Sequence, residues 1–471
     1  MSDSTEPECW RACLAGREIG PITKQYGDVH AGRWITDILI SIDMGYMMKS
    51  WIITVGEPTP LDGENPRLYR SGMLANVLAE RGNDVIWWTS AFDHANKKPR
   101  STRNAVVIMN RNLKIHMLNS ISYQKNISLA RVVNHAVIAA KILSWFRQEQ
   151  KPDIIIVSLP TIELAWVAVL WGKRYRIPVV VDVRDLWPDI FLELFPSGIR
   201  SVVYTLLRPY YEMARYACRN ALAIIGLTDP FVAWGLEKGN RARKESDRVF
   251  PMGYSITRPK EDSLVDAEEF WKQHGLSLEN EDFIVCFFGT MGRYFDLETV
   301  ISAAKLISTL QYPIRFVMCG TGDNLNYYKI LAGGCDNIFF PGWIDAAQIQ
   351  VLMRLSSVGL APYKNTPNFT LNLTNKPIEY LSSGLPVISS LKGILKDLID
   401  GNECGVTFEE GNPEDLVKIL VELYKTPEKV RDMSRNAKRL FEEQFVAEVV
   451  YDDLAKYLER LAENHKTKET K

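Results

Sequence analysis

The feature that most constrains the fold is an alternation of short apolar runs and helical periods, which occurs twice along the chain. Continuous apolar runs such as 153–158 (DIIIVS) and 179–183 (VVVDV) are typical of parallel strands with both faces covered by helices. The pattern starts at 51–55, pauses in a polar stretch at 235–282 and restarts at 283–288. The sequence therefore predicts an α/β protein with two doubly wound, Rossmann-like domains and a ligand cleft at the strand ends.

The expected elements can be placed from these runs. In the first half we expect strands over 51–55, 84–89, 104–109, 114–118, 153–158, 179–183 and 221–225, and helices over 68–80, 129–148, 162–175 and 201–217. In the second half we expect strands over 283–288, 314–319, 338–340, 358–361 and 386–389, helices over 297–310, 346–355 and 376–383, and further helices after Pro413.

These elements give the domain boundaries. The first domain is predicted over 48–235, a connecting segment over 236–282, the second domain over 283–445, and a last helix with a polar tail over 446–471. Residues 1–47 show neither the residue period of a strand nor that of a helix. Two interpretations stay open for them: a flexible, disordered N-terminal arm, or an upstream extension outside a protein that starts at Met48 or Met47.

The net charge of −1 conceals two halves of opposite sign. Residues 51–250 carry 27 Lys and Arg against 18 Asp and Glu, whereas residues 251–471 carry 24 against 32. In the basic half, Arg208, Arg215 and Arg219 recur on one face of a helix that also carries apolar residues. This helix either lies on an anionic membrane surface or packs normally with a solvated basic face. No nucleic-acid-binding motif appears, so nucleic acid is not an expected partner.

Cysteine usage and hydropathy indicate the compartment. The seven cysteines are scattered and form no CxxC pair, which favours a reducing, cytosolic compartment and no zinc site. No apolar run reaches about 18–20 residues, so we expect no membrane-spanning helix. The first thirty residues do not fit a secretory signal.

Two glycine loops follow strands of the second half. Gly289 and Gly292 with Arg293 follow one strand, and Gly320 with Gly322 follows the next. Such glycines let backbone N–H groups approach an anion near a helix N-terminus, although each pattern also fits an ordinary turn. The third glycine of a dinucleotide fingerprint is missing, which disfavours a nicotinamide enzyme.

A third motif, NKPIEYLSSGLPVI at 375–388, places Lys376 and Glu379 on one face of a short helix. A cation and a carboxylate at a helix N-terminus suit a nucleotide: the cation holds phosphate and the carboxylate holds the ribose hydroxyls. The alternative is a capping pair.

This motif resembles the signature of glycosyltransferase family 4, which has the GT-B fold, and the resemblance extends over roughly residues 48–460. It implies a retaining transfer from a nucleotide sugar without metal or other cofactor, a ribose contact at Glu379 and a C-terminal helix that returns to the first domain. It also implies a role beside the nucleotide base for the strand and loop ending at Trp343. Positive groups and helix N-termini then offset the charge of the leaving diphosphate.

Motifs of the first half narrow the resemblance to a polysaccharide-assembly branch, similar to the O-antigen N-acetylfucosamine transferase. RDLWPD at 184–189 is its most specific mark. Asp185, at a strand end, is the candidate to accept or orient the acceptor hydroxyl proton, and Arg184 the candidate to hold an acceptor phosphate. The alternative is an Arg–Asp pair that braces the strand end against Trp187. The other acceptor-side candidates are Gly63, Arg67, Arg70, His94, Asn126 and Arg131.

The chain departs from the family pattern at four places. Leu371 stands where a first glutamate is usual, and Thr290 and Phe295 stand where an Arg and a Lys usually hold the diphosphate. SLP at 158–160 replaces the usual acceptor-domain His. Arg293 or Lys376 is expected to substitute for the missing basic pair.

The leading hypothesis is a glycosyltransferase at the inner face of the cell membrane. It would use a nucleotide sugar and a lipid-diphosphate-linked saccharide in capsule, O-antigen or exopolysaccharide assembly. Two alternatives remain at this stage: a GT-B sugar-nucleotide 2-epimerase, and a non-catalytic nucleotide-sugar-binding subunit of a transferase complex. The sequence does not specify the sugar, the acceptor or the linkage.

Overall fold

The computed structural model describes residues 47–63, 66–126, 128–193, 195–256, 259–277 and 282–469. Residues from Met48 to Lys471 form one compact unit. The two interpretations of residues 1–47 concern a segment that, apart from Met47, lies outside the described residues.

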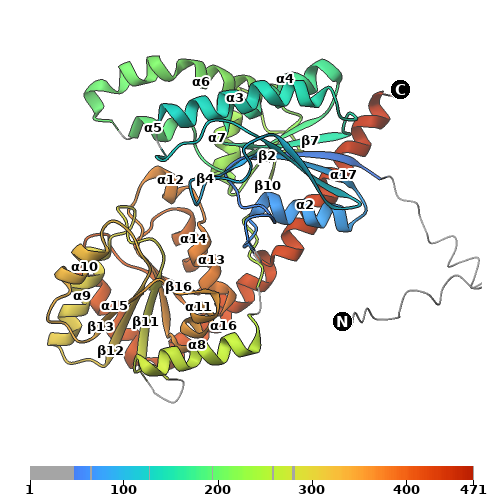
Figure 1. Cartoon of the computed structure of the whole chain (residues 1–471). Helices are drawn as coiled ribbons and strands as arrows, with labels where there is room; N and C mark the ends of the chain where they lie inside the picture. Colours follow the sequence, from blue (N-terminus) through green and yellow to red (C-terminus); the bar gives the residue numbers. More distant parts are fainter. Residues whose placement is uncertain are drawn as a thin grey trace, which may run out of the picture. The chain divides into compact units, whose positions relative to one another are not determined.

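An eight-stranded sheet forms the first domain, in the order β10-β9-β8-β7-β1-β2-β6-β5 (Figure 1). Its strands pair in parallel, except for β5 with β6. The chain runs from β1 to β2 on one side and later to β7 on the other, so a switch point lies beside β1. The strands are β1 Lys49–Ile53, β2 Asp84–Ser90, β5 Ala105–Asn110, β6 Leu113–Leu118, β7 Ile154–Leu159, β8 Val179–Val183, β9 Ala223–Gly226 and β10 Arg248–Val249, with a separate hairpin of β3 Phe92–Asp93 and β4 Lys98–Pro99.

Helices cover both faces of this sheet because alternate strand residues point to opposite sides. Trp51 and Ile53 join one core with side chains of α3, α4, α6 and α7, while Ile52 joins another with α2 and α17. The helices are α2 Arg70–Glu80, α3 Leu129–Phe146, α4 Ile162–Tyr175, α5 Asp189–Glu193, α6 Arg200–Asn220, α7 Asp229–Gly239 and α17 Ala447–Glu469, with a 3-10 turn at Ser197–Ile199.

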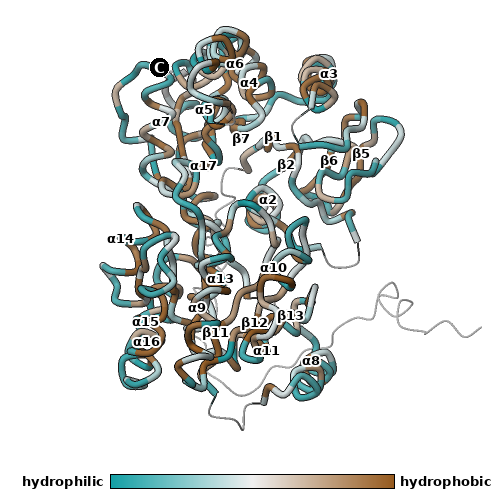
Figure 2. Tube along the Cα trace, turned by 90° about the vertical axis from the view of Figure 1, so that its left-hand side faces the viewer, coloured by the Kyte–Doolittle hydropathy of each residue, from teal (hydrophilic) through white to brown (hydrophobic). Residues whose placement is uncertain are grey.

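A six-stranded parallel sheet forms the second domain, in the order β13-β12-β11-β14-β15-β16. Its strands are apolar, and Figure 2 shows brown, apolar residues along its central strands. The strands are β11 Phe283–Phe288, β12 Ile314–Cys319, β13 Ile338–Gly342, β14 Val358–Ala361, β15 Val387–Ser389 and β16 Gly405–Thr407. The helices are α8 Glu261–Gln273, α9 Leu297–Thr309, α10 Leu325–Leu331, α11 Ala346–Leu355, α12 Pro367–Thr370, α13 Asn375–Ser382, α14 Ile394–Gly401, α15 Pro413–Lys425 and α16 Pro427–Gln444.

Helix α17 follows the second domain in the chain but packs on the first. Tyr451, Leu454 and Leu458 belong to the core that contains Ile52 and the side chains of α2. Arg81, just after α2, forms ion pairs with Asp452 at 2.7 Å and Glu459 at 2.7 Å. The two domains are therefore joined by two separate chain segments, 250–260 and the start of α17.

The predicted fold class, two doubly wound α/β domains, is confirmed, but several elements differ from expectation. The polar composition of 236–282 predicted only a connector, yet this stretch carries the end of α7, strand β10 and helix α8. Helix α8 buries Ala267 and Trp271 in the core of the second domain and leaves its charged residues in solvent. Strand β16 and the short helices α5, α10, α12 and α14 were also not expected.

Among the described residues, α3 alone is long and apolar enough, by length and composition, to cross a membrane, whereas the sequence predicted no such helix. Helices buried in a protein core meet the same criteria. Ile138, Ile142 and Phe146 of α3 pack into the core of the first domain.

Candidate active site

Helix α13 holds Lys376 and Glu379 nearly buried in the second domain. Glu379 Oε1 accepts hydrogen bonds from Tyr254 Oη at 2.9 Å and from Arg67 Nη1 at 3.3 Å. The Arg67 guanidinium also lies 4.9 Å from the centroid of the Tyr254 ring. Arg67, expected on the acceptor side, thus contacts the carboxylate expected to bind the donor.

The ammonium group of Lys376 points to the end of β11. It donates to the carbonyl of Phe288 and lies 4.5 Å from the Phe287 ring centroid. Burial lowers the pKa of Lys376 to about 8, although the nearby Glu379 carboxylate acts in the opposite direction. A Cβ at Gly289 would lie 2.5 Å from Nζ, so a side chain there would displace the lysine ammonium from its present position.

At the other glycines of these loops, the space for a side chain is limited by neighbouring backbone or is not limited at all. A Cβ at Gly320 would lie 1.8 Å from the Gly289 carbonyl oxygen, and one at Gly322 would lie 2.4 Å from the Met291 carbonyl oxygen. These glycines therefore allow the two loops to pack back to back. At Gly292 a Cβ would meet only Thr290 Cγ2 at 3.9 Å, so no steric need for glycine exists there.

Arg293 and Trp343 lie on the surface. Arg293 Nη2 donates to Tyr294 Oη at 3.2 Å. Trp343, directly after β13, is 72% exposed, which leaves its indole ring accessible to a ligand.

The departures from the family pattern have structural counterparts. Phe295 packs its ring 4.7 Å from that of Tyr363 and 5.3 Å from Lys376 Nζ. An aromatic ring therefore lies beside the buried ammonium where a basic residue is usual. The carbonyl of Leu371 accepts from Thr228 Oγ1 at 2.7 Å, and its side chain packs against the first domain's core. The position of the missing carboxylate thus serves as a contact between the domains.

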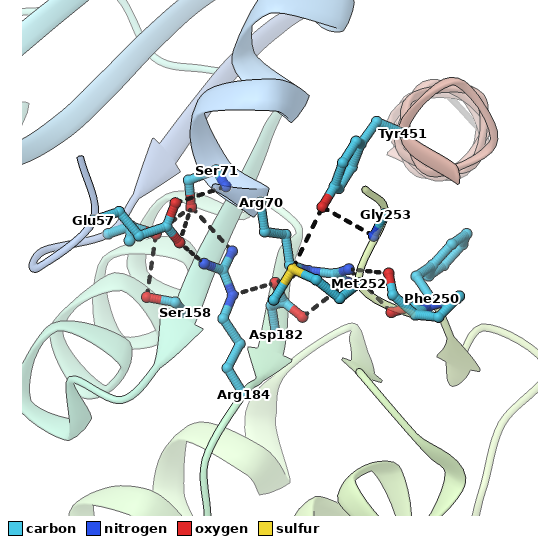
Figure 3. A network of polar contacts seen from close by, with 12 residues as sticks. Glu57, Arg70, Ser71, Ser158, Asp182, Arg184, Phe250, Met252, Gly253 and Tyr451 are labelled. Atoms are coloured by element: carbon cyan, nitrogen blue, oxygen red, sulfur yellow. Dashed lines mark hydrogen bonds and ion pairs between the residues drawn. The ribbon is translucent and has the colours of Figure 1, made fainter. Parts of the chain in front are cut away.

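A buried ion network lies in the first domain (Figure 3). Asp182, at the end of β8, accepts from Arg70 Nε at 2.8 Å and Nη2 at 3.2 Å, and from Arg184 Nε at 2.7 Å. Burial alone would raise the pKa of Asp182, but the charges of Arg70 and Arg184 outweigh it and lower this pKa. Arg70 Nη1 also donates to the carbonyls of Phe250 and Pro251, both at 3.0 Å.

Glu57 links this network to the start of helix α2. Its carboxylate forms an ion pair with Arg184 Nη1 and accepts from the Ser71 backbone N–H at 2.9 Å. Figure 3 shows Arg184 reaching between Glu57 and Asp182. The first-turn N–H groups of a helix favour such a carboxylate.

Arg184 and Asp185, although adjacent, have separate partners. Arg184 joins the buried network, and its side chain is only 13% exposed, while Arg70 is fully buried. Arg184 and Arg70 therefore act as positioning groups, which fix the end of strand β8 and the loop between β1 and α2. The brace that the sequence suggested as Arg184 with Asp185 is instead formed by Arg184 with Asp182.

Asp185 lies on the same strand end outside this network. Its Oδ1 accepts from the Leu186 backbone N–H at 2.9 Å and its Oδ2 from Trp187 Nε1 at 3.2 Å. Burial raises the pKa of Asp185 to about 6 despite these bonds and the charge of Arg131. A carboxylate with this pKa is ionised at neutral pH and can take up a proton.

His94, Lys97, Asn126 and Arg131 lie together, and the charge of Arg131 acts on Asp185. His94 Nδ1 lies 2.7 Å from Tyr123 Oη, and burial, with Arg131 and Lys97, lowers the pKa of His94 to about 4. The Arg131 guanidinium lies 4.7 Å from the Trp187 ring centroid. We call His94, Lys97, Asn126 and Arg131 the basic cluster. Gly63, in contrast, is exposed and a Cβ there would meet nothing within 4 Å.

Sequence reasoning missed five residues that the structure brings to the site. Asp182, Glu57, Lys97 and Tyr254 were not named as site residues, and Glu163, which accepts from Tyr210 Oη at 3.3 Å, was not considered. Asp182 and Glu57 could have been found as acidic residues at ends of predicted strands. Tyr254 lies in a stretch without a motif. Within the described ranges, no three His, Cys, Asp or Glu side chains gather as a metal site requires.

Two doubly wound domains, with a charged helix N-terminus on one and strand-end carboxylates on the other, define a protein of the GT-B class. The family model described as "Glycosyl transferase 4-like domain" matches residues 70–253, and that described as "Glycosyl transferases group 1" matches residues 269–440. The chain is a glycosyltransferase of the GT-B type. No curated protein sequence matches it.

Solved structures share this fold at low sequence identity. Sucrose-phosphate synthase from Thermosynechococcus elongatus is 16% identical, with a TM-score of 0.64 over 88% of this chain and 99% of that one. Anabaena HepE in complex with UDP-glucose is 17% identical, with a TM-score of 0.56 over 87% and 98%. WaaG, a glycosyltransferase involved in lipopolysaccharide biosynthesis, is 14% identical, with a TM-score of 0.58 over 87% and 99%.

Proposed function

We propose that this glycosyltransferase moves a sugar, with retention of configuration, from a nucleotide sugar to a lipid-diphosphate-linked saccharide in capsule, O-antigen or exopolysaccharide assembly. The observation that carries the proposal is the loop between β1 and α2, which touches both candidate sites. Its Glu57 forms an ion pair with Arg184, the neighbour of Asp185, and its Arg67 contacts Glu379. Donor and acceptor groups can therefore meet across one loop.

The proposed donor site comprises Glu379, Lys376 and the exposed Trp343. Glu379 would accept from the ribose hydroxyls, where Arg67 and Tyr254 now donate. Lys376 would contribute positive charge at the end of β11, where the leaving diphosphate is expected. HepE, which shares the fold, has been solved with UDP-glucose, and this supports a nucleotide sugar as donor.

The first prediction concerns Glu379. Glu379→Gln should raise the KM for the nucleotide sugar by about 10–100-fold, because a charge-assisted hydrogen bond is replaced by a neutral one. Initial rates at varied donor concentration measure this. Glu442→Gln, on the exposed face of α16, is the control and should leave KM unchanged. A wild-type KM in the Glu379 variant would remove this residue from the donor site.

The reaction itself is tested by incubating the protein with labelled nucleotide sugars and an undecaprenyl-diphosphate sugar. Transfer of label to the lipid supports the proposal. An epimerised nucleotide sugar without transfer would instead identify a sugar-nucleotide 2-epimerase.

The proposed location is the inner face of the cell membrane, with the start of α6 against the lipid. Val202 and Leu206 are 62% and 73% exposed there, and Arg200 and Arg208 lie exposed among them. Exposed apolar and basic side chains on one helix suit an anionic bilayer surface. The buried Tyr211 and Ala214 show that the second half of α6 packs in the core.

The second prediction tests this surface. A Val202→Ser, Leu206→Ser double variant should bind phosphatidylglycerol vesicles about tenfold more weakly, since apolar area is lost from the contact. Raising the salt concentration should weaken wild-type binding as well. Vesicle sedimentation measures both effects. Ile330→Ser, which alters an exposed apolar residue of the second domain, is the control. Unchanged sedimentation of the double variant would exclude α6 as the contact.

A further inference from the structure

Lys97 and Arg131 bring two positive charges to one side of the acceptor domain, beside the strand end that carries Asp185. Lys97 lies in the turn between β3 and β4, and Arg131 lies in the first turn of α3. Lys97 Nζ donates to the His94 carbonyl at 2.6 Å and to Asn126 Oδ1 at 2.5 Å, and Arg131 Nη1 donates to the Asn126 carbonyl at 2.8 Å. Asn126 thus holds the two cations close together.

Neither cation is neutralised by a direct ion pair. Within the described ranges, no carboxylate oxygen lies within 4.0 Å of Lys97 Nζ or of the Arg131 guanidinium. Burial lowers the pKa of both side chains, and the charge of Arg131 lowers that of Lys97 further. Holding these like charges together is unfavourable without an anion between them.

The carboxylates around the basic cluster are engaged elsewhere. Asp93 accepts from the backbone N–H groups of Ala95 and Asn96. Asp185 accepts from Leu186 and Trp187, and Glu163 from Tyr210. These groups offset the positive charge at longer range and leave donors of the basic cluster without an acidic partner.

Arg131 also has an unused donor. Its Nε is buried and, among the described residues, no acceptor bonds to it. Its guanidinium is held in place by the Trp187 ring at 4.7 Å and the Tyr123 ring at 6.0 Å. A fixed, partly unsatisfied guanidinium is suited to bind a phosphate oxygen.

We propose that Arg131 and Lys97, with His94 beside them, bind a diphosphate ester, namely the diphosphate of the lipid-linked acceptor. This inference rests on the proposed function and assigns the acceptor phosphate to the basic cluster instead of Arg184, which is paired with Asp182 and Glu57. The next side chains of α3, Leu129, Val132 and Val133, are exposed and apolar, which offers the attached lipid chain an apolar surface.

The direct test is binding of inorganic pyrophosphate to the full chain, measured by titration calorimetry. Lys97→Gln should weaken pyrophosphate binding by about tenfold or more, because one charge-assisted contact is lost. Lys98→Gln, at the exposed neighbouring residue, is the matched control. Arg131→Lys, which keeps the charge but loses the planar fork, should bind with intermediate affinity. Equal affinity of the Lys97→Gln protein and the wild type would overturn the proposal.

Two further measurements identify the source of the phosphate. The Lys97→Gln variant should raise the KM for an undecaprenyl-diphosphate sugar but not the KM for the nucleotide sugar. If the variant loses only phosphatidylglycerol vesicle binding, the basic cluster meets phospholipid head groups and the proposal is wrong. If pyrophosphate binding depends on Lys97 but no transfer to lipid diphosphate occurs, the basic cluster is an anion-binding site. The proposal that it binds the diphosphate of a lipid-linked acceptor is then wrong.

Discussion

Asp185→Asn is expected to lower kcat by about 10²–10⁴-fold, the range that a positioned proton acceptor contributes. Asp185 is the strand-end carboxylate whose two oxygens accept from Leu186 and Trp187 and keep lone pairs for an acceptor hydroxyl. The amide retains the shape of the side chain but cannot accept the proton. Initial rates at saturating donor and acceptor measure the effect. Asp266→Asn, on the exposed face of α8, is the control.

The same residue predicts a pH dependence. Burial raises the pKa of Asp185 to about 6, and the required form is the ionised one. The wild-type kcat/KM should therefore be constant above pH 6 and fall about tenfold per pH unit below it. The residual activity of the Asp185→Asn protein should lack this acidic limb. An identical limb in both proteins would assign the titration to another group.

Asp182→Ala is expected to destabilise the first domain by about 3–5 kcal/mol, the cost of breaking a buried ion pair from one side. Arg70 and Asp182 are both fully buried, and Arg184 shares the same carboxylate. Without Asp182, the Arg70 guanidinium would stay buried without a counter-charge, and Arg184 would keep only its ion pair with Glu57. Thermal unfolding followed by circular dichroism measures the loss, and a melting temperature equal to that of the wild type would contradict it.

A surface ion pair provides the control for this prediction. Glu268→Ala removes the partner of Arg354, at 3.3 Å, where both side chains are well exposed, and should cost about 0–1 kcal/mol.

The contribution of Asp182 to stability should also depend on pH. Because the folded pKa of Asp182 is lowered, its contribution is present above the unfolded pKa and is lost as pH falls through the folded pKa. Asp182→Ala and wild type should thus converge in stability under strong acid.

The elements that the sequence placed most accurately are the buried parallel strands. Strands β8 and β11 have the predicted bounds, because strands covered on both faces are apolar throughout and end abruptly. Helix α8 was missed because its burial depends on Ala267 and Trp271, while charged residues dominate its sequence. Leu264 and Phe270 also pack against this core, but the charged residues between these positions obscure the apolar period.

The candidate site was only partly predictable. The motif around Glu379 and the strand end at Asp185 were both found from residue type and position, since ligands bind at the ends of parallel strands. The partners of these residues were not found. Arg67 lies 312 positions from Glu379, and no local spacing connects them. Likewise Arg184 pairs with Asp182 and Glu57 and not with the adjacent Asp185.

The sequence by itself determined the alternation of strands and helices, the two domains and the opposite charges of their halves, because these follow from local periodicity and residue type. Only the tertiary structure decided which charges neutralise one another. Arg70, Arg184 and Arg131 are chemically equivalent in the sequence, yet the first two are paired with buried carboxylates and the third has none within 4.0 Å among the described residues. Such pairing depends on side chains that converge from distant strand ends, and this convergence distinguishes the two arginines that support the fold from the one that we propose binds a diphosphate.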